Sequence, residues 1–364
     1  MKAVIIGGGI AGLAAAISLK KTGLDVVVKE KTATFREVGL GFIILPNGLR
    51  ALDSLGAGEY ARHHGRIMHQ AVIRTPDGAV QKQDSLPDCL GLKRSSCIDA
   101  LRRMVPENVV HTGFEFSRFL FDDSGQAVAV ESTTGEVEEG DVFIAADGAN
   151  SIIRKKLFPL HEIRQSPIKE LVGIVELPAL AREQKGNLVK TQCNYRPLSF
   201  GTLACNDRQV IWYMQFDSTQ FNLPDLSVHS KRQFMTETLQ GWPDPVSEVI
   251  EKTDFDKAFL WLTKDMDVLR SFHRKNIVLI GDAAHLNLPL TSQGTNSALT
   301  DAIMLGDILQ NNPAPAELGK LFTTYHQRRQ QTLKDYLNYG RMLENRFLHP
   351  ELYQHEEALI PLAK

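Results

Sequence analysis

The hydrophobic pattern of the first 30 residues predicts a strand, a helix and a second strand. Residues 2–6 (KAVII) form a short β-branched run, typical of a strand that is covered on both faces of a parallel sheet. The Ala- and Leu-rich stretch that follows predicts a helix ending at Gly23. Val26, Val27 and Val28 then predict a second strand, which leads to Glu30. The chain therefore opens with a β-α-β unit.

The middle of the chain has a different pattern, in which apolar and polar positions alternate. Residues 70–90 predict a hairpin around Pro76-Asp77-Gly78. Residues 127–147 alternate, turn at Gly135 and end in the apolar strand VFIAA. Residues 168–217 hold several strand-like runs, which indicate a sheet-rich region.

A buried-strand pattern returns at residues 276–282, before a predicted helix at about 294–310 and a charged helical region at about 315–347. We therefore predict an α/β fold with a Rossmann-like nucleotide-binding domain, an inserted β-sheet domain and a helical C-terminus. The expected boundaries are 1–68, 92–165 and 270–364 for the nucleotide-binding domain, and 69–91 and 166–269 for the inserted substrate-binding domain.

Composition narrows the class of protein. A chain of 364 residues with 43% hydrophobic and 23% charged positions is typical of a globular protein of about two domains. The formal charge of −2 gives no support to a nucleic-acid partner. No run of 18 apolar residues predicts a membrane span, and no group of His, Cys and carboxylates has metal-site spacing. We expect a cytoplasmic protein that binds small molecules.

Glycines follow the first strand at a spacing typical of dinucleotide binding. Gly7 permits a tight turn, Gly9 lets backbone approach a pyrophosphate, and Gly12 lets helix and strand pack closely. The pyrophosphate would lie at the N-terminus of the helix, and Glu30 would accept hydrogen bonds from ribose hydroxyls. This motif alone leaves FAD and NAD open.

Two further strands end in a glycine and an acid. The strand VFIAA is followed by Asp147-Gly148, with Arg154 beyond, and the strand VLI is followed by Gly281-Asp282. Open α/β sheets bind ligands at the carboxyl ends of their strands. Three such turns in one chain predict a binding site for a long dinucleotide.

The three motifs, G-x-G-x-x-G, D-G-x-x-S-x-x-R and G-D-A-A-H…P…Q-G-x-N, resemble in this order those of the FAD-dependent aromatic hydroxylases. These are class A flavoprotein monooxygenases of the p-hydroxybenzoate hydroxylase type. The resemblance runs from Met1 to about Gln310 and implies an FAD-binding domain of the GR2 type. It implies that the following residues bind the cofactor: Gly7, Gly9, Ile10, Ala11, Gly12, Glu30, Lys31, Gly41, Arg94, Asp147, Arg154, Gly281, Asp282, Pro289, Gly294, Thr295 and Asn296.

The resemblance also implies a reaction. FAD would be held tightly but not covalently, with NAD(P)H as a transient reductant. The reduced flavin would capture O₂ as a C4a-hydroperoxide and hydroxylate a small, electron-rich aromatic substrate. His285 and Pro289 would lie near the flavin as candidate catalytic residues, although His285 also fits a role of fixing its loop through hydrogen bonds.

The substrate pocket is expected between the flavin and the sheet-rich domain. Its candidate wall residues are Tyr195, Arg196, Trp212, Tyr213 and Gln215. Strand alternation puts Trp212 and Tyr213 on opposite faces, so only one of them can face the flavin. Packing within the sheet is an equal alternative for both, and solvation is an alternative for Arg196.

One departure from the family pattern concerns the flavin loop, where Ser292 stands in place of a glycine and Thr295 in place of a smaller residue. Two other functions remain alternatives: a related flavoenzyme such as a halogenase or a reductase, and a non-catalytic FAD-binding protein. The sequence Trp261-Leu262-Thr263-Lys264 does not match the W-x-W-x-I-P motif of flavin halogenases. The choice between NADH and NADPH, the substrate, and a monomeric or dimeric state stay open.

Overall fold

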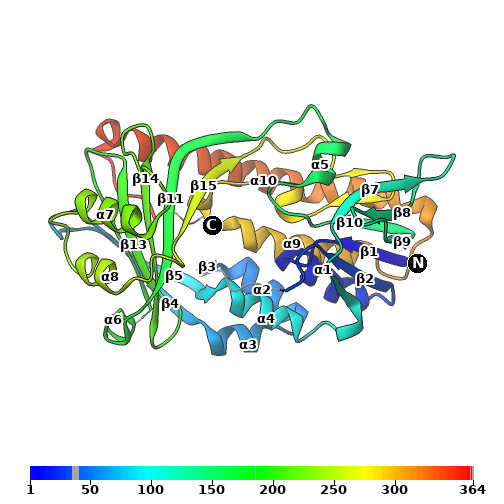
Figure 1. The fold of residues 1–364 in the computed structure, drawn as a ribbon, viewed down its shortest axis with the longest axis horizontal. Coiled ribbons are helices and arrows are strands. Elements are labelled where there is room, and N and C mark those ends of the chain that lie inside the picture. The colour runs from blue at the N-terminus through cyan, green and yellow to red at the C-terminus, as the bar shows by residue number, and fades with distance from the viewer. Residues whose placement is uncertain (35–40, 185, 361, 363–364) are drawn as a thin grey trace.

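Two large β-sheets lie side by side along the longest axis of the molecule (Figure 1). The computed structural model describes residues 1–34, 41–184, 186–360 and 362. We call the six-stranded sheet of the first domain sheet I and the eight-stranded sheet sheet II. Near the end of the chain, Ile360 and Leu362 pack against apolar residues of sheet II.

Sheet I is built from short buried strands that the chain contributes at widely separated positions. Every neighbouring pair is parallel except the pair at the edge, β16 and β17. Parallel pairing brings the carboxyl ends of the central strands to one edge of the sheet. In spatial order the strands are β16 (His273–Arg274), β17 (Ile277–Leu279), β10 (Val142–Ala145), β1 (Lys2–Ile6), β2 (Asp25–Glu30) and β6 (Val110–Thr112).

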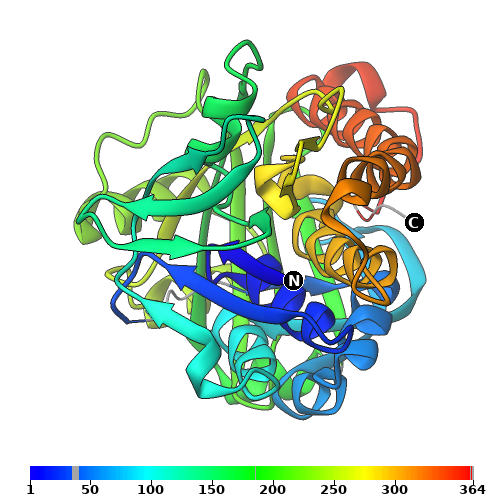
Figure 2. The ribbon, with the colours of Figure 1, turned by 90° about the vertical axis from the view of Figure 1, so that its right-hand side faces the viewer.

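Helices and a small sheet cover sheet I. Helix α1 (Ile10–Lys20) packs against α9 (Gln293–Ile308) in one apolar core. A three-stranded sheet of β7 (Phe116–Phe121), β8 (Ala127–Ser132) and β9 (Val137–Glu139) packs against the strands through contacts such as Phe119 with Phe143 (Figure 2). Four further helices belong to this half: α2 (Pro46–Leu55), α3 (Gly58–His64), α4 (Arg94–Arg102) and α5 (Ile152–Leu157).

Sheet II is mostly antiparallel; only β12 and β4 pair in parallel. One face is covered by α6 (Pro178–Glu183), α7 (Val228–Thr238) and α8 (Val246–Lys252), which bury an apolar cluster around Trp212. In spatial order the strands are β15 (Phe259–Asp265), β11 (Arg164–Glu176), β14 (Gln209–Asp217), β13 (Leu198–Ala204), β12 (Asn187–Gln192), β4 (Arg66–Arg74), β5 (Val80–Lys93) and β3 (Gly41–Ile44).

The long helix α10 (Leu318–Leu348) runs beside both halves (Figure 1). Arg341 on this helix and Arg164 at the start of β11 both bind the fully buried Asp265 on β15. Burial alone would raise the pKa of Asp265, but its hydrogen bonds to the two guanidinium groups hold that pKa below its usual range. This shared carboxylate fixes α10 to the end of sheet II.

The predicted fold class is confirmed, including the β-α-β start, the hairpin of β4 and β5, and the helical C-terminal region. Several strands were not predicted, among them β3, which lies within residues 1–68, pairs with β5 and becomes the edge of sheet II. The domain boundaries themselves stay a prediction. Among the described residues, no helix combines the length and the apolarity that crossing a bilayer requires.

Candidate cofactor and substrate site

The first glycine motif forms the turn between β1 and α1. Gly7 has a φ of +109°, and a Cβ on Gly12 would lie 1.8 Å from the Gly7 carbonyl oxygen, so neither position accepts a side chain. Gly9, the N-cap of α1, is different, because a Cβ there would meet no described atom within 4 Å. The N-terminus of α1, where Ile10 and Ala11 follow, therefore opens onto free space beside its backbone N–H groups.

Glu30 ends β2 at the same edge of sheet I. Its Oε2 accepts a hydrogen bond from the Gly8 N–H at 2.6 Å, and its Oε1 accepts two from Thr32 at 2.9 Å. A carboxylate offers about four acceptor positions, so this one retains capacity for a ligand hydroxyl. Lys31, the next residue, is exposed.

The second and third motifs are joined by Arg154. This guanidinium is buried and donates to the carbonyl oxygens of Asp282 (2.9 Å), Ala283 (3.1 Å) and Ala149 (2.7 Å). Asp147 is occupied locally, because it accepts from the Ser151 hydroxyl and, at 3.1 Å, from the Ile153 N–H. Arg154 and Asp147 thus shape the turns rather than presenting free groups to the site.

Asp282 has the opposite character. Within the described part of the chain, no donor hydrogen-bonds to its carboxylate, which points toward Gly294 at the start of α9. Burial raises the pKa of Asp282, and the charges of His285, Arg154 and Arg94 oppose that rise. Arg94, at the start of α4, therefore lies close enough to act on the same site.

The loop before α9 contains the predicted flavin contacts. Pro289 starts a 3-10 helix that ends at Thr291, and Ser292 has a φ of +54°. Gly294 and Thr295 lie in the first turn of α9 and are half-buried. The Asn296 side chain is fully used by backbone, because it accepts from the Leu45 N–H and donates to the carbonyl oxygens of residues 43 and 292. Asn296 thus braces the loop, and only its backbone remains for a cofactor.

His285 lies in the core. Its Nε2 is 2.6 Å from Asp301 Oδ2, and Asp301 also accepts from Arg329 Nε at 2.7 Å and from the Gly281 N–H at 2.8 Å. We call these four residues the Asp301 cluster. His285 is 2% exposed and its ring packs beside Phe272. This placement favours the structural alternative for His285 over a catalytic one.

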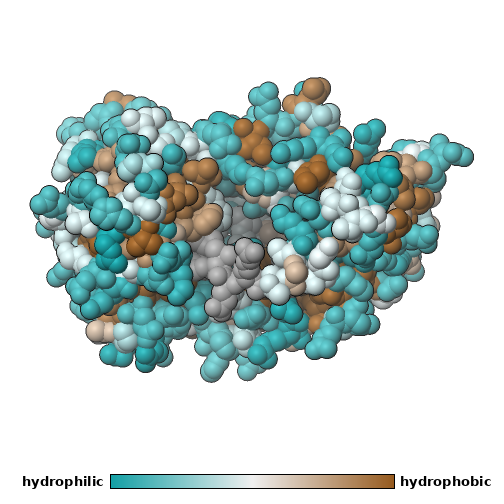
Figure 3. Space-filling model, viewed as in Figure 1, coloured by the Kyte–Doolittle hydropathy of each residue, from teal (hydrophilic) through white to brown (hydrophobic). Residues whose placement is uncertain are grey.

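The face of sheet II that looks toward sheet I, the cleft face, carries Tyr213 and Gln215. Tyr213 lies flat over Gly201, where a Cβ would be 2.2 Å from the ring. Gln215 is buried and bonded to Lys190, Ser199 and Glu170. The surface between the two halves of the molecule is hollowed (Figure 3).

Trp212 and Arg196, two of the other three predicted wall residues, lie on the opposite side of sheet II. Trp212 is fully buried on the opposite face of sheet II, between Phe200 and Phe255, because strand alternation turns it toward α7 and α8. Tyr195 is 69% exposed. Arg196 is also exposed and stacks 4.6 Å from the centre of the Phe221 ring, which belongs to the same cluster as Trp212. Trp212 and Arg196 were therefore wrong as wall residues of the cleft, whereas the role of Tyr195 stays a prediction.

Comparison with known proteins now gives the family. Residues 1–338 match the family described as FAD binding domain. The chain belongs to this family. It is 26% identical over 358 residues to Monooxygenase 1 of Arabidopsis thaliana, an alignment that covers 93% of this chain and 86% of that protein. It is 28% identical over 335 residues to the FAD-dependent urate hydroxylase of Klebsiella oxytoca, covering 86% of this chain and 82% of that protein.

The fold of this FAD-binding family member is shared by solved structures. HpxO from Klebsiella pneumoniae, complexed with FAD and uric acid, superposes with a TM-score of 0.88 at 22% identity, over 98% of this chain and 91% of that one. The homologues of the chain thus include FAD-dependent monooxygenases and hydroxylases, as the sequence motifs implied.

The residues at the edge of sheet I fit FAD. The open space at Gly9 suits a pyrophosphate on the α1 N-terminus, and Glu30 keeps acceptor capacity for ribose hydroxyls. The unpartnered carboxylate of Asp282 suits the hydroxyls of a ribityl chain. Gly41, at the start of β3, packs so closely against Ile211 on β14 of the same sheet that no Cβ fits.

The sequence reasoning missed Lys190, Glu170 and Ser199. All three surround Gln215 on the cleft face. A lysine within the predicted strand at residues 187–192 only weakly indicates a binding residue, because the alternation of side chains does not show which face of the strand meets the cleft.

Proposed function

We propose that this protein is an FAD-dependent monooxygenase that uses NAD(P)H and O₂ to hydroxylate a small aromatic substrate. The observation that carries the proposal is the convergence of Gly9, Glu30 and Asp282 at one edge of sheet I, opposite a polar cleft face of sheet II. The monooxygenases and hydroxylases among its relatives support the reaction class.

Bound FAD would supply the electron transfer from NAD(P)H and the activation of O₂. The chain supplies binding and orientation. Backbone N–H groups at the start of α1 would hold the pyrophosphate, Glu30 the ribose, and Asp282 the ribityl hydroxyls. The N–H groups of Gly294 and Thr295 would face the ring, with the Pro289 loop beside it.

Sheet II would hold the substrate. Its cleft face presents a tyrosine, a glutamine and a lysine, while the opposite face is closed by α7 and α8. The Asp301 cluster would position the loop rather than touch the reacting atoms, because His285 Nε2 and Arg329 Nε both hydrogen-bond to one buried carboxylate. Residues 69–91 and 166–269 would form the substrate domain.

The test of the reaction is oxygen incorporation. The purified protein should be yellow, and a panel of phenols and hydroxylated aromatic acids should contain a compound that stimulates NAD(P)H oxidation. Under ¹⁸O₂ the product of that compound should gain one ¹⁸O atom. A flavin that NAD(P)H reduces but that inserts no oxygen into any panel member would favour the reductase alternative, and an inert flavin would favour a non-catalytic protein.

A matched pair of glycine variants tests the cofactor site. Gly9→Val should fold normally, since its Cβ meets no described atom within 4 Å, but should bind FAD at least about tenfold more weakly because the side chain fills the pyrophosphate position. Gly319→Val, in the first turn of α10 and with equally open surroundings, is the control and should retain FAD. Flavin absorbance after desalting measures both. Full retention of FAD by Gly9→Val would show that the pyrophosphate does not bind at this turn.

A further inference from the structure

We propose that Lys190 binds a negatively charged oxygen of the substrate, in a small cavity on the cleft face of sheet II. The inference rests on the proposed function and names its substrate class, an aromatic compound that carries a carboxylate or a similarly compact anionic group. Lys190, Gln215 and the cavity walls carry the argument.

Lys190 is a buried ammonium without a neutralising partner. It lies in the middle of β12, is 3% exposed, and donates to Gln215 Oε1 at 3.1 Å. Among the described residues no carboxylate forms an ion pair with its Nζ, Gln215 is its one hydrogen-bond acceptor, and the Nζ also lies 5.8 Å from the centre of the Phe347 ring. An ammonium has three donors, and burial of an unpaired charge costs several kcal/mol. The lysine therefore offers two free donors and a charge that no ion pair neutralises.

Gln215 keeps the lysine apart from the nearest acid. Its Oε1 accepts from Lys190 and, at 3.1 Å, from Ser199, while its Nε2 donates to Glu170 at 2.8 Å. The amide is thus fixed between the two charged groups and prevents a direct ion pair. Burial lowers the pKa of Lys190 to about 8 and raises the pKa of Glu170, as expected for charges that do not neutralise each other.

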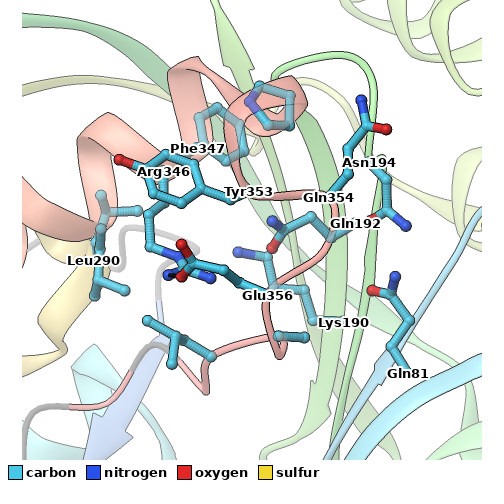
Figure 4. Close-up of a pocket in the computed structure, with 14 residues that line it drawn as sticks. Gln81, Lys190, Gln192, Asn194, Leu290, Arg346, Phe347, Tyr353, Gln354 and Glu356 are labelled. Atoms are coloured by element: carbon cyan, nitrogen blue, oxygen red, sulfur yellow. Dashed lines mark hydrogen bonds and ion pairs between the residues drawn. The ribbon is translucent and has the colours of Figure 1, made fainter.

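The cavity beside Lys190 has the size and polarity for a compact anion. Gln81, Lys190 and Gln192 lie on one side, and Leu290 and Arg346 lie on the other (Figure 4). Its only acid among the described residues is Glu356, which is already paired with Arg346, so one positive charge is left over.

The cavity volume of about 70 Å³ decides which part of the substrate enters. An apolar cavity of about 150 Å³ holds a benzene ring, so this cavity accepts a carboxylate but no ring. The ring would extend past Leu290, which follows Pro289 in the predicted flavin loop. An anionic group on Lys190 would therefore orient the ring toward the flavin.

Other charged groups face this lysine from the elements packed around it. They are Glu170 on β11, Tyr213 on β14, Arg346 on α10 and Glu356 in the C-terminal segment. Burial raises the pKa of Glu170 and also raises that of Tyr213 above its usual range, so neither supplies a competing charge as readily as an exposed acid. Lys190 thus dominates the charge of the cavity.

The experiment compares charged ligands with their neutral isosteres. FAD-loaded protein without NAD(P)H is titrated by calorimetry with benzoate, 4-hydroxybenzoate and salicylate, and with benzamide, 4-hydroxybenzamide and salicylamide. Wild type should bind at least one acid more tightly than its amide. Lys190→Met should lose about tenfold or more of that acid affinity and leave the amide affinity unchanged. Lys252→Met, an exposed residue on α8, removes the same net charge and should behave as wild type.

Two results would overturn the proposal. One is a wild type that does not prefer any acid over its amide, including one that binds none of the six compounds. The other is an acid preference that Lys190→Met retains. Because no turnover is involved, this binding result is independent of the reaction. An acid preference that depends on Lys190, together with a failure to insert oxygen, would leave the anion site standing and reject the monooxygenase.

Discussion

Asp301 and Lys190 are both buried charged residues, one behind the predicted flavin loop and one on the cleft face. The protein surrounds Asp301 with charged partners but gives Lys190 none within ion-pair distance. Asp301 has three donors around it, from Gly281, His285 and Arg329. Burial alone would raise the pKa of Asp301, but the charges of His285 and Arg329 outweigh it and hold that pKa at about 2. Lys190 has one neutral acceptor, and its pKa falls to about 8 because burial dominates.

The difference separates structure from binding. A buried charge that the protein neutralises by itself has no capacity left for a ligand, so it fixes backbone. A buried charge that faces a cavity without a counterion destabilises the free protein and is stabilised by a ligand of opposite charge. Changes in the Asp301 cluster should therefore affect folding, and changes on the cleft face should affect binding.

The largest effect is expected from Asp301→Ala. This change leaves Arg329 buried without a counterion and should lower the free energy of unfolding by about 3–5 kcal/mol. Chemical denaturation measures the loss. Asp335→Ala, at an exposed position of α10, is the control and should change stability by less than about 0.5 kcal/mol. Equal stability of the two variants would show that the Asp301 cluster is not structural.

Gly201→Ala should have the next largest effect. The new Cβ would lie 2.2 Å from the Tyr213 ring, and overpacking of this kind costs about 1–3 kcal/mol. In a Tyr213→Ala background the same change should cost much less, so a double-mutant cycle should give a coupling of about 1–2 kcal/mol. If the free-energy changes of the two substitutions were additive, the Tyr213 ring would not occupy the space that a side chain at position 201 needs.

Lys190→Met should stabilise the free protein by about 1 kcal/mol at pH 7, because it removes an unneutralised buried charge. The gain should shrink between pH 8 and pH 10. In that window the native lysine, with a pKa of about 8, has lost its proton, whereas the unfolded chain, with a pKa near 10.5, retains it. The unfolded state then binds more protons, so wild-type stability rises with pH. Chemical denaturation of both proteins at pH 7 and at pH 10 measures this difference. A variant that is less stable than the wild type at pH 7 would contradict the claim that Lys190 is unpaired.

Ser292→Gly should have the smallest effect. Ser292 adopts a φ of +54°, which is unfavourable for a residue with a side chain, and its side chain forms no capping hydrogen bond to α9. Glycine should stabilise the fold by about 0.5–1 kcal/mol, the strain relief being partly offset by backbone entropy. Ser292→Ala keeps the strain and should show no gain. A gain of the same size in both variants would rule out backbone strain as the cause.

Much of the cofactor edge was predictable from the sequence, because its signals are local. Gly7, Gly9 and Gly12 lie within one turn, and Glu30 ends the next strand, so spacing alone specifies the geometry. The apolar runs before Asp147 and Asp282 likewise placed both turns at strand ends. The structure added which acid is free, since Asp147 is occupied locally and Asp282 is not.

The cleft face was less predictable, because its residues meet only through strand pairing. Alternation showed that Trp212 and Tyr213 point in opposite directions, but the helices α7 and α8 decide which direction is the core. The three strands that carry Lys190, Gln215 and Glu170 come together through the order of sheet II, in which β14 and β11 are adjacent and β13 separates them from β12.

The sequence by itself determined the family, the nucleotide-binding topology and the positions of the glycine turns, because each depends on residues close together along the chain. Only the tertiary structure decided that Asp301 is neutralised and that Lys190 is not, since a charge is neutralised by its neighbours in space. Arg329 reaches Asp301 from another helix, whereas Gln215 stands between Lys190 and Glu170. Such long-range placement sets the electrostatics of the cleft.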